Sequence, residues 1–168
     1  MNKINQRTAD SIIQLFDEMG SQQAEWQREK GWAEEGDTLR EIREDMKHYP
    51  LPKHPIYLSR SNAALRNYYI SKLALIATEV AEAIEEIRDG REIGERYYSA
   101  TFSTSELAED GYPAPGPDKP EGVLSELADI IIRVWSLAGE AGLPLGEAVV
   151  EKLNYNSTRV FRHGGKVI

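Results

Sequence analysis

The sequence contains no cysteine, so disulfide bonds and thiolate metal sites are excluded. It has no apolar run near the roughly 18 residues that a membrane-spanning helix needs. Its first residues, Met1 to Arg7, lack the basic-then-apolar order of a secretory signal. Together these absences predict a cytoplasmic protein that does not enter a membrane.

Positive charge is scarce, since 20 lysines and arginines face 28 acidic residues and leave a net charge of -8. A protein that binds nucleic acid needs a positive face, so nucleic acid is not expected as a partner. The chain also has no glycine-rich phosphate loop, nucleophile elbow or paired-histidine metal motif. The charge therefore favours a small ligand whose phosphates are bridged to the protein by divalent metal ions, or no such site at all.

Helical periodicity dominates the chain, and its 168 residues suit one domain spanning 1–168. Apolar residues recur at helical spacing in 8–30, 38–47, 62–88, 121–141 and 144–160. Thr8 and Asp10 are the candidate caps of the first helix. No segment shows a convincing strand pattern, so the predicted fold class is all-α, with the main helices around one core.

Residues 91–120 lose this periodicity and are rich in proline and glycine. A connection of this length inside a compact domain is uncommon, and it is usually a functional lid or a disordered insert. We therefore expect a long irregular insert that acts as a loop or lid.

Two acidic pairs lie on the two strongest helices, Glu79 with Glu82 and Glu126 with Asp129. Each pair has i, i+3 spacing, which puts both carboxylates on one flank of their helix. The flank lies beside an apolar stripe, and packing the two stripes together would bring the acids to one rim. Magnesium prefers such hard oxygen ligands.

A different interpretation of these pairs stays open at this point. With so many acidic residues, an isolated pair on a helix is most often part of a solvated face, and Arg133 is a plain intrahelical partner for Asp129. The two apolar stripes are those expected to form the core. They consist of Leu73, Ile76, Val80, Ile84 and Ile87, and of Leu124, Leu127, Ile131, Val134 and Ala138.

Three segments resemble a known protein family in sequence, which adds to the spacing of the acidic pairs. The run LALIATEVAEAIEE over 73–86 resembles the metal-binding helix of MazG-type pyrophosphohydrolases, and ELADIIIRV over 126–134 resembles their second metal helix. The ending KLNYNSTRVFRHGGK over 152–166 is similar to that of one MazG-like branch. More weakly, EWQREKGW over 25–32 resembles the aromatic end of the first helix in this family, which borders the base pocket.

The resemblance implies a MazG-like helical bundle that hydrolyses a nucleoside triphosphate to the monophosphate and pyrophosphate. It implies Mg²⁺, with Mn²⁺ as a substitute, bound by Glu79, Glu82, Glu126 and Asp129, and assembly as a homodimer or homotetramer. Two departures are the insert, which separates the acid pairs by more than forty residues, and Thr78, where some members carry a further glutamate.

The remaining candidates concern the substrate. Metal-assisted attack by water at the α-phosphorus would use Glu79 or Glu82 as proton acceptor, with Lys152 as a further catalytic group. The expected nucleotide-binding residues are Trp26, Trp32, Lys152, Tyr155, Asn156, Arg159, Arg162, His163 and Lys166. The alternatives are a phosphoribosyl-ATP pyrophosphohydrolase-like enzyme and a non-catalytic helical interaction module.

Overall fold

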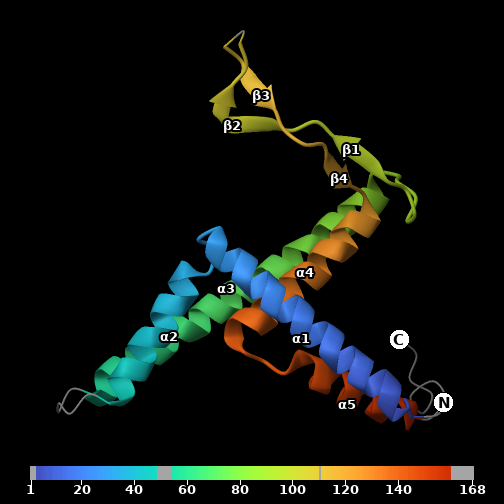
Figure 1. Cartoon of the computed structure of the whole chain (residues 1–168). Helices are drawn as coiled ribbons and strands as arrows, with labels where there is room; N and C mark the ends of the chain where they lie inside the picture. Colours follow the sequence, from blue (N-terminus) through green and yellow to red (C-terminus); the bar gives the residue numbers. More distant parts are fainter. Residues whose placement is uncertain (1–2, 49–53, 110, 160–168) are drawn as a thin grey trace. The chain divides into compact units, whose positions relative to one another are not determined.

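The computed structural model describes residues 3–48, 54–109 and 111–159 (Figure 1). The chain forms two compact units, the first made of residues 1–69 and 134–168 and the second of residues 70–133. The helices are α1 (Gln6–Glu29), α2 (Glu34–Lys47), α3 (His54–Arg88), α4 (Val123–Ala141) and α5 (Leu145–Ser157). Four short strands complete the described part of the chain: β1 (Tyr97–Ser99), β2 (Phe102–Leu107), β3 (Pro113–Pro115) and β4 (Lys119–Glu121).

The prediction of a mostly helical protein is confirmed, and the expected helix positions hold with shifted ends. The cap of α1 is Asn5, whose side chain accepts a hydrogen bond from the Thr8 backbone N–H at 2.9 Å, so the prediction of Thr8 or Asp10 was wrong. Helix α3 begins earlier than expected, at His54. Pro55 falls in its first turn, where the missing N–H breaks no helix bond.

Close helix contacts hold the first unit together. Helices α1 and α4 approach backbone to backbone at Gly20 and Gly139, where an added side chain on Gly139 would overlap the Gly20 carbonyl. Beside this crossing the rings of Phe16 and Trp135 meet edge to face, with centroids 5.8 Å apart. Glycine is therefore required there to let the helices pack this closely.

A buried polar network also lies in the first unit. The Tyr68 hydroxyl donates a hydrogen bond to the buried Glu140 carboxylate. Arg40 forms ion pairs with Glu140 at 3.4 Å and with Asp37 at 2.6 Å. Charge pairing of this kind compensates for the burial of Glu140.

In the second unit, the insert between α3 and α4 contains strands, which corrects the prediction of an irregular segment. We call residues 97–121 the arm. Strands β1 and β4 pair antiparallel with Tyr97 opposite Glu121, and β2 pairs antiparallel with β3. In Figure 1 the β1–β4 sheet lies beside the end of α3 and the start of α4, and β2 and β3 lie farther from the helices. Three of the strands have only three residues, too few for alternation to be visible, and proline is tolerated because every strand is an edge strand.

The apolar stripes of the second unit do not form its core, contrary to prediction. Leu73, Val80, Ile84 and Ile87 of α3 are about half exposed. On α4, Leu124, Leu127 and Ile131 are also exposed. Instead, Glu79 and Ala83 are buried on α3, and Glu126 is buried on α4. Glu79 and Glu126 thus lie on the packed faces of the two helices rather than on an outer rim.

Candidate metal site

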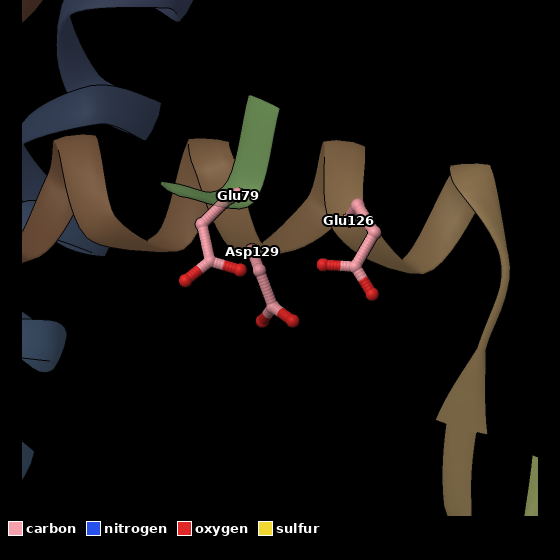
Figure 2. A group of neighbouring side chains, drawn as sticks. All are labelled: Glu79, Glu126 and Asp129. Atoms are coloured by element: carbon pink, nitrogen blue, oxygen red, sulfur yellow. The ribbon is translucent and has the colours of Figure 1, made fainter. Parts of the chain in front are cut away.

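Three acidic side chains of the second unit converge between α3 and α4. Each of Glu79, Glu126 and Asp129 offers one carboxylate oxygen, and these three oxygens lie within 4.8 Å of one another. Figure 2 shows Glu79 reaching from α3 to the Asp129 carboxylate, with Glu126 nearer the start of α4. We call these three residues the carboxylate site.

Local sequence explains why these side chains meet. Glu126 and Asp129 are one turn apart on α4, so both face the same neighbour. Glu126 lies in the first turn, after the backbone turn at Gly122. On α3, Glu79 shares its buried face with Ala83, whose small side chain leaves room for the approach of α4. The positions of the three acids along α3 and α4 therefore determine that their carboxylates meet.

Burial makes the site electrostatically unusual. Only 4% of Glu79 and 4% of Glu126 is exposed. Burial is the largest cause that raises the pKa of the Glu126 carboxyl to about 7. The negative charges of Glu82, Asp129 and Glu79 raise it too, and Lys119 acts against them. Burial, followed by the charge of Glu79, also raises the pKa of Asp129.

One atom of the site lacks a hydrogen-bond partner. Oε2 of Glu126 is buried without one among the described residues. A buried carboxylate oxygen without a partner carries a large free-energy cost, which a bound cation would remove. A single Mg²⁺ places its ligand oxygens about 3–4 Å apart, so a small side-chain adjustment brings the three oxygens within its reach. The hard-oxygen donors and the unpartnered atom both fit a divalent cation.

Arg133 pairs across the helices and not with Asp129, the intrahelical partner suggested by the sequence. Its Nε and Nη2 atoms both contact Oε1 of Glu79. This ion pair balances one charge of the site and holds the Glu79 side chain in place. Asp129 still senses Arg133, whose charge opposes the rise in the Asp129 pKa.

The structure also brings a cation from the arm toward the site. Lys119 of β4 donates a hydrogen bond to Glu121 at 2.9 Å, and Glu121 also accepts one from Ser99 at 2.7 Å. The Glu121 contact is the main cause that raises the pKa of Lys119, and the charges of Glu126 and Glu82 add to it. Sequence reasoning missed Lys119 because only strand pairing, which it did not foresee, brings this lysine near the acids.

The other predicted residues are distributed as follows. Glu82 is exposed on α3 and is not one of the three converging residues, although its charge acts on Glu126. In the first unit, Lys152, Tyr155 and Asn156 lie on α5 and Arg159 follows it. The Lys152 ammonium lies 5.2 Å from the centroid of the Tyr155 ring. Arg162, His163 and Lys166 lie outside the described residues.

Trp26 and Trp32 lie in the first unit, where their rings meet edge to face with centroids 5.2 Å apart. Both are partly exposed. Their assignment to a base pocket stays a prediction, as do the roles of the residues on α5.

No helix within the described ranges is both long enough and apolar enough to cross a membrane. No protein-family model matches this chain, and neither a curated protein nor a solved structure shows significant similarity to it. The carboxylate site is consequently the feature from which a function has to be argued.

Proposed function

We propose that this chain is a magnesium-dependent nucleoside triphosphate pyrophosphohydrolase of the MazG-like kind. The observation that carries the proposal is the convergence of three carboxylates between two helices, one of them with a buried, unpartnered oxygen. The buried acids destabilise the fold unless a cation compensates them. The sequence resemblance over 73–86 and 126–134 assigns these three residues, together with Glu82, to metal binding.

In the proposed site, Glu79, Glu126 and Asp129 hold Mg²⁺, with Glu82 next to them on α3. The bound metal supplies charge neutralisation for the phosphates and activation of water. Glu82, which is exposed and one turn from Glu79, accepts the proton of the attacking water at its carboxylate. The bond from the α-phosphorus to the bridging oxygen breaks, and pyrophosphate leaves.

A lysine of the arm completes the proposed site. Lys119 interacts through its charge with both Glu126 and Glu82. Its ammonium is therefore well placed to meet a phosphate oxygen. The resemblance separately assigns Lys152, Asn156 and Arg159, which belong to the first unit, to phosphate binding.

We further propose that the chain assembles as a homo-oligomer. The exposed apolar residues of α3 and α4 give the second unit an apolar surface on both helices. Large apolar patches on a protein surface mark interaction sites, so we assign these residues to an interface. A second copy of the chain is the partner that the resemblance implies.

A nucleotide panel tests the activity. Each nucleoside triphosphate is incubated with the protein and Mg²⁺, and pyrophosphate and orthophosphate are measured separately. We expect pyrophosphate with the wild type and with Glu85→Gln, a matched control whose carboxylate pairs with Arg88 at the surface. Asp129→Asn should lose most of this activity. Orthophosphate as the product would contradict cleavage between the α- and β-phosphates, and no product from any nucleotide would favour an interaction module.

A further inference from the structure

A hollow of the second unit lies where the arm meets α4. Its volume is about 210 Å³. We call it the arm-root pocket, and it is lined by Arg96, Tyr97, Tyr98, Pro120, Glu121, Leu124, Ser125 and Ala128. Nothing in the sequence patterns indicated it, because its walls come from strands that the sequence did not reveal.

The arm-root pocket is adjacent to the carboxylate site along α4. Ser125 directly precedes Glu126, and Ala128 directly precedes Asp129. Neighbouring residues on a helix point about 100° apart. The pocket residues of α4 thus lie on a side of the helix next to the side that carries Glu126 and Asp129, and the charge of Glu121, which lines the pocket, acts on Asp129.

Hydrogen bonds hold the walls of the pocket in place. The Tyr97 hydroxyl donates to Glu86 at 2.8 Å, and the Arg91 guanidinium lies 4.2 Å from the centroid of the Tyr97 ring. The Ser125 hydroxyl donates to the Pro120 carbonyl at 3.0 Å, which ties β4 to the start of α4. Such prior ordering lowers the entropy lost when a ligand binds.

The chemistry of the lining selects the occupant. Tyr98 is 66% exposed, and Arg96 is exposed beside it, so a phenol ring and a planar guanidinium are both accessible. Aromatic faces and guanidinium planes stack on nucleobases of any sequence. The Glu121 carboxylate would repel a phosphate, yet it accepts hydrogen bonds from ring N–H or amino groups.

We propose that the arm-root pocket binds the base of the nucleotide, stacked on Tyr98, while its phosphates occupy the carboxylate site. This inference rests on the proposed function. It assigns base recognition to the arm and not to Trp26 and Trp32, and it gives the arm a specific role in binding.

Paired titrations test this assignment. With Mg²⁺ present, calorimetry measures the affinity of the full chain for a non-hydrolysable nucleoside triphosphate analogue and for inorganic tripolyphosphate, which has no base. Tyr98→Ala should weaken binding of the analogue about tenfold, which corresponds to the loss of one stacking contact. Its affinity for tripolyphosphate should be unchanged. Tyr98→Phe should retain affinity for both, because the ring remains.

The matched control is Phe102→Ala, which removes another exposed aromatic ring of the arm, one that does not line the pocket. It should bind both ligands as the wild type does. Equal affinity of Tyr98→Ala and wild type for the analogue would overturn the pocket assignment. So would an equal loss for both ligands. Failure of the wild type to bind tripolyphosphate with Mg²⁺ would instead overturn the proposed function.

Discussion

Individual carboxylates determine the electrostatics of the second unit. Glu79 and Glu126 occupy positions that apolar residues would normally take between two helices. The resulting cost is carried by ion pairing for Glu79, through Arg133, and by a raised pKa for Glu126. Glu79 and Glu126 are thus equally buried, but the free-energy cost of burial is compensated differently in each.

The raised pKa of Glu126 predicts a dependence of stability on pH. In the unfolded chain this carboxyl loses its proton near its ordinary pKa of 4.5, whereas the folded chain keeps it to about pH 7. Between these values the folded state binds more protons, so the contribution of Glu126 to the free energy of unfolding falls as pH rises. With chelator present, Glu126→Gln should gain in melting temperature relative to wild type as pH increases from 5 to 8.

The comparison isolates one residue, because all other titrating groups are shared by the two proteins. Thermal unfolding followed by circular dichroism measures the difference at each pH. A difference that stays constant across this range would show that the Glu126 carboxyl titrates normally in the folded chain.

Lys119 provides a second prediction at this scale. Because its charge acts on Glu126 and Glu82, removing it should weaken binding of a phosphate ligand to the magnesium-loaded site. We expect Lys119→Gln to lower the affinity for tripolyphosphate by about five- to tenfold, as for the loss of one charge-assisted contact. Lys47→Gln is the control, since Lys47 also pairs with a glutamate, Glu44, but on α2. Equal affinities of the two variants would remove Lys119 from the site.

At the scale of elements, the sequence predicted which segments are helical better than it predicted which side of each helix is buried. The period of Leu73, Val80, Ile84 and Ile87 identified α3 correctly, because an amphipathic helix keeps the same spacing whatever covers its apolar side. Periodicity carries no information about the covering partner. The stripe was therefore assigned to the core, although it is exposed in the single chain.

The same reasoning explains what was foreseen of the candidate metal site. Spacing placed Glu79 with Glu82, and Glu126 with Asp129, each pair on one side of its helix. All of these except Glu82 converge in the structure. The other features of the site depend on tertiary contacts. The pairing of Arg133 with Glu79 and the position of Lys119 both depend on residues that are distant in sequence.

The exposed stripe yields a prediction about assembly. Ile84→Glu adds a charge to an apolar position that is 52% exposed in the single chain. It should cost the monomer little stability, but it should prevent the burial of this face against a second copy. We expect light scattering after size exclusion to show an oligomer for the wild type and a monomer for the variant.

Ile93→Glu is the matched control, since Ile93 is another exposed isoleucine of this unit but lies outside the helices. It should leave the oligomer intact. A wild type that is monomeric at micromolar concentration would contradict the assembly proposal.

At the scale of the whole molecule, the net charge of -8 makes cations a condition for binding a nucleotide. We predict that Mg²⁺ and a non-hydrolysable triphosphate analogue each raise the affinity for the other by the same factor, at least about tenfold. Calorimetric titration of the analogue with and without Mg²⁺ measures this factor. Identical affinities in the two titrations would be incompatible with the carboxylate site as the phosphate-binding site.

The β1–β4 pairing at the base of the arm indicates that the chain tolerates changes in the length of the arm. Gly122 has a φ of +105°, and a Cβ there would lie 2.6 Å from the Glu95 carbonyl oxygen, so the chain leaves and rejoins the helices at one place. Ser99 and Lys119 face each other across the β1–β4 ladder. A two-residue Asn-Gly turn matches the geometry of such a pair. The segment between them is therefore a modular insertion, and replacing it with this turn should yield a shorter chain that keeps both its cation affinity and its base recognition.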